Sequence, residues 1–349
     1  MPLMVNRLKK YSLIAGLGWL ILAQTVRWSH PVITAISWAV FGGVAGWWVW
    51  RRRWATLLAV WRSPLLPVAG VAVVSALING GWWSRVADWT LYAVALAYLV
   101  DQRPNADREI VRVGWWVIGI SLFEWLGLVM LGGEHGYRVR LLGNPNVIAG
   151  MLLVVWPLGL ERLTGQRRRW WWWLGLAAMI ATGSRGGLLG LALYGVHKLN
   201  IKKWVLFVVV IIVLVALIPV RIRSSADRID MYIQAMYDAV KQPIFGIGPG
   251  MYRDYIATRQ HVTVGSWWNY NHVVYMHAHN VVLTALAEMG LIGLAGWALA
   301  VWQARRWTVR DAARLAALLP VFLVDDMTMY WAVMLGVVYV ISQSQEVRT

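Results

Sequence analysis

The chain is built from apolar runs of roughly 15–22 residues that recur from end to end, with short basic stretches between them. A helix needs roughly 20 consecutive apolar residues to cross a bilayer. The composition agrees, since 59% of the 349 residues are hydrophobic, a larger share than soluble domains carry. The sequence therefore predicts an all-α, polytopic membrane protein whose residues 1–349 form a single transmembrane helical domain.

We expect about twelve transmembrane helices. The basic stretches, such as 51–53 and 167–169, all fall on one side of the membrane, as Lys and Arg do in cytoplasmic loops. This pattern predicts a cytoplasmic N-terminus and a large outer loop, 221–276, between the ninth and tenth spans, in the periplasm or the exoplasmic space. The expected spans lie near 11–26, 31–50, 63–80, 86–100, 110–131, 146–160, 170–184, 186–199, 204–220, 279–302, 312–325 and 327–342.

Charge and composition also argue against several classes of function. The net charge is +17, but it is divided among short loops and forms no contiguous basic face for nucleic acid. There are no cysteines, which excludes disulfides and thiolate chemistry, and no P-loop motif for ATP. The 26 tryptophans suit membrane interfaces, where an amphipathic ring settles among the headgroups.

The large loop contains a predicted amphipathic helix over 226–241. Ser224 with Asp227 three residues later resembles a capping box at its start. We expect this helix to lie along the membrane surface or to roof a cavity. Apolar side chains recur there at the spacing of one helix face, at Ile229, Tyr232, Ile233, Met236, Tyr237 and Val240.

Polar residues that could carry chemistry gather on the outer side. Arg185, in "ATGSRGG", is either an interfacial arginine reaching for water or an anion site at a helix N-terminus. Arg228 near the start of the amphipathic helix is either a solvated charge or a second phosphate ligand. Two acids within apolar spans, Glu124 and Glu288, are candidates for a proton relay or for pairing with an arginine.

The segment "HAHN" stands at the mouth of a long apolar helix. A histidine there can act as a general base, or it can simply bond to its own helix end. A metal site is disfavoured because His277 and His279 are two residues apart, whereas ligands on one helix face need a spacing of three or four. Asn280 can cap the helix or hold an imidazole tautomer.

Four segments occur together in an order that resembles the O-antigen ligase and polymerase superfamily, which includes bacterial O-oligosaccharyltransferases. They span residues 138–296, the part we expect to form a ligase/polymerase-like core. The segments are "GNPNVIAGMLLVVWPL", "TGSRGGLLGL", "RIDMYIQAMYDAVKQPIFGIGPGMY" and "HAHNVVLTALAEMGLIGL".

The resemblance implies a metal-independent glycosyltransferase without a cofactor, in the bacterial inner membrane, with its active site facing the periplasm. Such enzymes of lipopolysaccharide biosynthesis move a glycan from an undecaprenyl-diphosphate carrier to an acceptor hydroxyl, here lipid A–core. By the family's motifs, Arg185 and Arg228 bind the diphosphate and His279, or its neighbour in the motif, is the general base. The expected substrate-binding residues are His277, Asn280, Arg138, Arg140 and Ser184.

Two alternatives remain within the superfamily, an O-antigen polymerase and a protein O-oligosaccharyltransferase, because they share the donor and the motifs. A twelve-helix transporter or flippase is a further alternative from another class. Transporters usually consist of two related halves with a site at the midplane. This chain shows no internal repeat, and its polar motifs gather at one surface.

Overall fold

The computed structural model describes the residues 63, 65–81, 86, 90, 110–130, 144–199, 222–252, 255, 278–304, 317, 318 and 320–322. Within this part the chain is helical or loop, with no strand, which confirms the all-α prediction there. The expected spans 11–26, 31–50, 204–220 and 327–342, and most of 86–100 and 312–325, lie outside the described residues. The count of twelve therefore stays a prediction.

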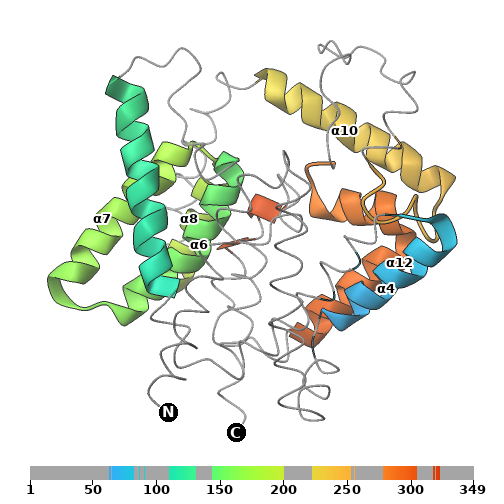
Figure 1. The fold of residues 1–349 in the computed structure, drawn as a ribbon, viewed down its shortest axis with the longest axis horizontal. Helices are drawn as coiled ribbons and strands as arrows, with labels where there is room; N and C mark the ends of the chain where they lie inside the picture. Colours follow the sequence, from blue (N-terminus) through green and yellow to red (C-terminus); the bar gives the residue numbers. More distant parts are fainter. Residues whose placement is uncertain are drawn as a thin grey trace, which may run out of the picture.

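The described helices follow the predicted spans closely, mostly within a few residues. Two of them, Ile110–Met130 and Val281–Gln303, are long and apolar enough to cross a membrane, and the shorter Leu66–Asn79 is also apolar. The helices are α4 (Leu66–Asn79), the unlabelled helix Ile110–Met130, α6 (Pro145–Arg162), α7 (Gly165–Thr182), α8 (Arg185–Leu199), α10 (Ile222–Lys241) and α12 (Val281–Ala304) (Figure 1).

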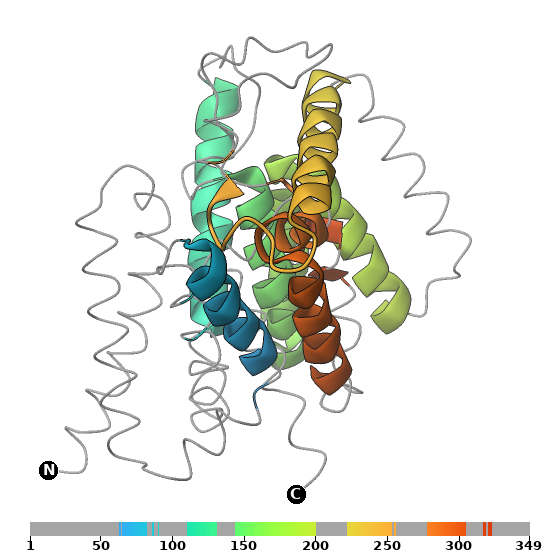
Figure 2. The same ribbon diagram turned by 90° about the vertical axis from the view of Figure 1, so that its right-hand side faces the viewer.

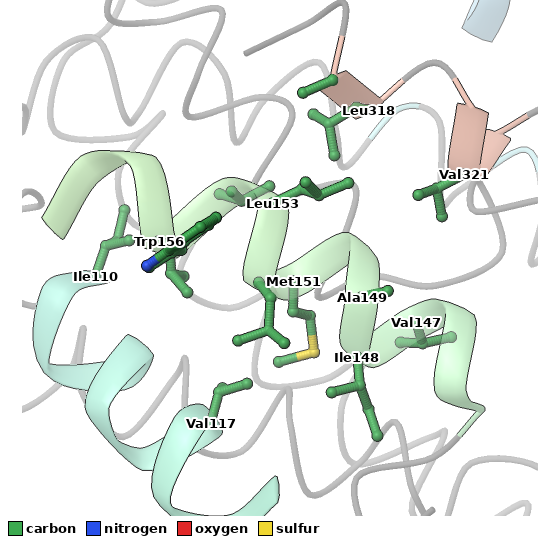
Figure 3. Packing of buried hydrophobic residues seen from close by; sticks show 14 of the residues in the cluster. Ile110, Val117, Val147, Ile148, Ala149, Met151, Leu153, Trp156, Leu318 and Val321 are labelled. Atoms are coloured by element: carbon green, nitrogen blue, oxygen red, sulfur yellow. The ribbon is translucent and has the colours of Figure 1, made fainter. Parts of the chain in front are cut away.

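The helix at the centre of the core is α6. Its side chains are buried on every face from Asn146 to Leu160, as expected for a helix that is apolar all round. Asn144 caps its start by accepting a hydrogen bond from the Asn146 N–H, and Pro145 occupies the first turn, where its missing N–H costs nothing. Helices α7 and α8 pack against α6. Figure 3 shows α6 side chains, among them Met151 and Trp156, facing Val117 and Ile110 of the preceding helix.

Two tryptophans hold α6 and α7 together deep in this core. Each indole N–H donates to the other residue's carbonyl, Trp156 to Trp171 at 3.0 Å and Trp171 to Trp156 at 2.8 Å. Both side chains are fully buried, so the expectation that tryptophans lie at membrane interfaces is wrong for this pair. Gly175 faces the Trp156 ring and Gly159 faces the Trp171 ring, in each case so closely that no Cβ would fit.

Replacing Trp171 with phenylalanine is expected to lower the free energy of unfolding by roughly 2–4 kcal/mol, because it removes one of the paired hydrogen bonds and leaves a void. Thermal unfolding in detergent measures the change. The control is Trp173→Phe on the same helix, where the side chain is 63% exposed and little change is expected. Equal shifts in Tm for both variants would contradict the structural role of the pair.

Two expectations about helix boundaries need correction. Helix α10 begins at Ile222, four residues before the predicted start, so Ser224 lies inside the helix and the capping box with Asp227 is wrong. The expected span 279–302 is not one continuous helix either. Its backbone leaves helical geometry at Gly290 (φ 64°, ψ −158°), and Figure 1 shows α12 as two pieces that run in different directions.

Candidate functional site

The turn between α7 and α8 is locked to the start of α6. Helix α7 ends at Gly183, whose left-handed backbone (φ 56°) suits glycine. The next residue, Ser184, is fully buried, and its hydroxyl donates to Asn146 Oδ1 at 2.8 Å. The same hydroxyl accepts the Gly187 N–H at 3.1 Å and so caps α8. The "GNPN" and "TGSRGG" segments therefore meet in one buried junction.

Close packing explains a glycine that follows the arginine in this motif. A Cβ on Gly187 would fall 2.6 Å from the Ala149 Cβ and 2.9 Å from the Met179 sulfur. These contacts bring α6, α7 and α8 together within one turn of Arg185. The backbone of Arg185, the first residue of α8, is therefore held in a closely packed region. A side chain that binds an anion in a defined geometry needs such support.

Arg185 is half-buried and carries an unsatisfied donor. Its Nε is buried and has no hydrogen-bond partner among the residues that the structure describes. Burial lowers the pKa of the Arg185 guanidinium from its usual value, and the positive charge of Arg228 lowers it further. The positive charges of Arg185 and Arg228 therefore act on each other in the folded protein. Two positive charges that act on each other make the local field positive, which favours an anion.

The helix that bears Arg228 is anchored to the start of α12. One turn beyond Arg228, the carbonyl of Met231 accepts a hydrogen bond from the Tyr252 hydroxyl at 3.0 Å. Further along α10, Ala235 shares a small buried cluster with Tyr252 and with Ala278. Because Ala278 directly precedes His279, the segments that carry Arg228 and His279 are parts of one packed unit.

His279 and Asn280 shape the beginning of α12. His279 has a left-handed backbone (φ 51°), the only described residue other than glycine with a positive φ. Such conformations are uncommon outside glycine, although histidine tolerates them better than bulky or branched residues. Asn280 Oδ1 accepts the N–H groups of Val282 at 2.9 Å and Leu283 at 3.1 Å, so of the two roles expected for Asn280 the helix cap is present.

Substitutions at Asn280 separate the cap from a contact with substrate. Asn280→Ala is expected to cost about 1 kcal/mol of stability, because two N–H groups of α12 lose their acceptor. Asn280→Asp keeps an acceptor and should retain both stability and activity if the cap is the whole role. Thermal unfolding and activity are measured on both variants. A stable Asn280→Asp protein without activity would show that the amide itself is needed.

A joint that sequence reasoning missed connects α10 to the break in α12. The segment 243–248 runs along α12 as an irregular backbone and supplies the hydrogen bonds that the helix lacks there. The Ile247 and Gly248 N–H groups donate to the carbonyls of Ala287 and Glu288, both at 2.9 Å, and the Leu291 N–H donates to the Pro243 carbonyl at 2.8 Å. The turn-rich segment "PIFGIGPG" indicated irregular backbone, but its sequence did not show that it would bond to α12.

Helix α4 completes this joint. The buried hydroxyl of Ser75 donates to the Phe245 carbonyl at 2.7 Å and lies 3.2 Å from the Glu288 carbonyl. Figure 2 shows α4 running beside the later part of α12, with α10 rising from the region where they meet. Helix α12, which begins two residues after His279, is therefore held on both sides of its break.

For the other residues that the sequence analysis singled out, the structure gives the burial of two and does not describe three. Glu288 is buried at the joint just described, and Glu124 is half-buried on the helix Ile110–Met130. His277, Arg138 and Arg140 lie outside the described residues. Within the part that the structure describes, no group of three His, Asp or Glu side chains could hold a metal ion.

The part of the sequence that contains these elements matches a known protein family. Residues 171–298 match the family model of O-antigen ligase. The O-antigen ligase segment begins in α7 and ends in α12, so it contains the α7–α8 turn, α10 and the start of α12. The superfamily resemblance drawn from the motifs is thereby confirmed for this segment, while the wider core 138–296 stays a prediction. A comparison with curated proteins gives no significant match to the chain.

The O-antigen ligase match supports a coarse functional class. Proteins of this family are membrane enzymes of glycan transfer in lipopolysaccharide biosynthesis, either ligase-like or polymerase-like. The two long apolar helices are in keeping with a membrane protein.

Proposed function

We propose that this protein is an O-antigen ligase-like glycosyltransferase of the bacterial inner membrane, with its site on the periplasmic side. The donor is a glycan linked to undecaprenyl diphosphate, and the acceptor is a hydroxyl, most simply one on lipid A–core. The observation that carries the proposal is the pair formed by Arg185 and Arg228. A buried guanidinium nitrogen that has no partner in the described part of the chain, and that is influenced by a second positive charge, suits a diphosphate.

In the proposed reaction, the acceptor oxygen attacks the anomeric carbon of the donor on the face opposite the diphosphate. The new bond joins that oxygen to the anomeric carbon, and the bond from the carbon to the phosphate oxygen breaks. Its electron pair leaves with undecaprenyl diphosphate, where the two arginines stabilise the negative charge. His279 accepts the proton of the acceptor hydroxyl. Attack from the opposite face inverts the anomeric configuration.

The fold supports separate roles for the residues around these three. Ser184 uses its hydroxyl within the protein, so we assign it to positioning Arg185. Asn280 fixes the first turn of α12 beside His279. No step of the proposed reaction needs a metal ion, since guanidinium groups can carry the charge of the leaving diphosphate.

The alternatives differ in the acceptor. A polymerase would transfer to a carrier-linked glycan, and a protein O-oligosaccharyltransferase to a polypeptide. A transporter or flippase would move a lipid-linked glycan or another solute without forming a glycosidic bond. Arg185 is the first residue of α8, and a ligand site at a helix end favours transfer over a transporter site at a midplane between repeats.

The test is incubation of the purified protein with an undecaprenyl-diphosphate-linked glycan and, in separate reactions, lipid A–core, a carrier-linked glycan and a protein acceptor. Mass analysis identifies the product. We expect a glycosylated lipid A–core, formed at the same rate with and without a metal chelator. Transfer to another acceptor would select an alternative within the superfamily. Movement of the lipid-linked glycan across vesicles without any transfer product would overturn the proposal.

A further inference from the structure

The apolar face of α10 points away from the protein. The predicted stripe was expected to lie on the membrane or to roof a cavity, and most of its side chains are exposed, with Ile233 at 60% and Val240 at 79%. The opposite face is the buried one, formed by Met231, Ala235, Asp238 and Ala239. The exposed members of the stripe are Ile229, Ile233, Met236, Tyr237 and Val240.

This exposed stripe is followed by exposed apolar side chains on the apolar helices α4 and α12. Beyond the end of α10, Ile244 is 55% exposed. It lies in the segment bonded to α4 and α12, since Asn79 of α4 donates to the Phe245 carbonyl and Leu291 of α12 to the Pro243 carbonyl. At those contacts α4 exposes Leu77 and Ile78, and α12 exposes Leu291. Helix α10 packs against α12, and α12 packs against α4, so the exposed apolar side chains of the three helices are linked through α12 and the segment 243–248 (Figure 1).

The end of α10 also carries side chains that suit a boundary between lipid and water. The Lys241 ammonium lies 4.4 Å from the centre of the Tyr237 ring. Tyrosine is enriched at the level of lipid headgroups, and lysine can lay its apolar stem on lipid while its charge reaches water. A cation at the C-terminal end of a helix is also favoured by the helix dipole.

We infer that α10 is an interfacial helix, with its stripe immersed in the bilayer leaflet on the side of the arginine pair. The occupant of the stripe is lipid. A row of five large apolar side chains exposed to water would be unfavourable, and the exposed apolar side chains that follow it belong to helices that lipid must cover. A second protein or a second copy of this chain would separate the stripe from those side chains.

An interfacial α10 also determines how deep in the membrane the diphosphate site lies, and this step rests on the proposed function. Arg228 lies in the first half of α10, one residue before the stripe begins. A helix whose stripe is immersed among acyl chains holds Arg228 near the lipid phosphates. The diphosphate of the donor can then bind at the depth that it already occupies in the membrane, without being lifted into water.

The absence of native cysteines makes a direct test possible. A single cysteine at Ile233 is spin-labelled, and the protein is placed in nanodiscs of phosphatidylethanolamine and phosphatidylglycerol. Collision of the label with oxygen, which concentrates in lipid, is compared with collision with a water-soluble nickel chelate. Phe123→Cys, on the membrane helix Ile110–Met130, is the lipid reference, and Gln166→Cys, exposed at the start of α7, is the water reference.

At Ile233→Cys we expect high collision with oxygen and low collision with the chelate, as at Phe123→Cys. Chelate access like that of Gln166→Cys would overturn the inference. Low collision with both reagents would mean that protein covers the stripe, which overturns it as well. Met236→Cys gives a second reading on the same stripe if the first variant does not fold. The measurement needs neither donor nor acceptor, so its outcome is independent of the transfer assay.

Discussion

Replacing Arg185 with alanine is expected to lower kcat for glycan transfer on the order of 10²–10³-fold, the usual cost of losing one preorganised donor to a charged leaving group. The backbone of Arg185 is positioned by the α7–α8 turn. The Nε of Arg185 is buried without a partner among the described residues, so we expect the diphosphate to be its partner. Because that contact strengthens as charge develops, the loss should appear mainly in kcat.

Two further variants make this result specific. Arg185→Lys keeps the charge but loses the planar fork of donors, so it should recover only a small part of the rate. Arg169→Ala, on the exposed start of α7, changes the net charge equally and should transfer at the normal rate. All three proteins are compared by circular dichroism and thermal unfolding. A folded Arg185→Ala protein with full activity would contradict the proposed diphosphate site.

Replacing Gly290 with alanine is expected to destabilise the protein by about 3 kcal/mol or more, because its backbone lies in a region essentially reserved for glycine and the site has no room for a methyl group. A Cβ there would collide with the backbone of Ile244, in the segment that closes the break in α12. The variant should therefore unfold at lower temperature or open the joint that holds the His279 end of α12.

The matched control is Gly119→Ala, within the helix Ile110–Met130. A Cβ at Gly119 meets nothing within 4 Å, so alanine should be neutral or stabilise the helix by roughly 0.5–1 kcal/mol. Unfolding temperature and transfer rate are measured for both variants. If Gly290→Ala were as stable and as active as Gly119→Ala, the break would not be a fixed part of the fold.

Several residues of the candidate site could be predicted because each stands in a recognisable short motif of the sequence. Arg185 lies between two apolar helices in a glycine-rich turn, and the sequence favoured an anion site there. The motif also predicted Arg228 as a second phosphate ligand, and that role stays a prediction, supported by the effect of its charge on Arg185. Of the two roles that the sequence left open for Asn280, a helix cap or a hold on an imidazole tautomer, the structure shows the cap.

Other features could not be predicted, since each depends on a partner far away in the chain. The break in α12 resembles an ordinary glycine within an apolar span, and only the segment 243–248 makes it stable. The burial of Trp156 and Trp171 requires that glycines on neighbouring helices make room for each ring. Helical periodicity located the apolar stripe of α10 but did not say which face the protein would bury.

By itself, the sequence determined that this chain is helical and apolar enough for a membrane, and which polar motifs stand at the ends of its helices. Those properties follow from composition and from the period of the helix, which act over neighbouring residues. Only the tertiary structure decided that α12 bends at Gly290, that Ser184 joins two motifs, and that the stripe of α10 faces outward. These outcomes depend on which backbone and side-chain groups meet across the fold, because a buried polar group or a broken helix is stable only where another segment satisfies its hydrogen bonds.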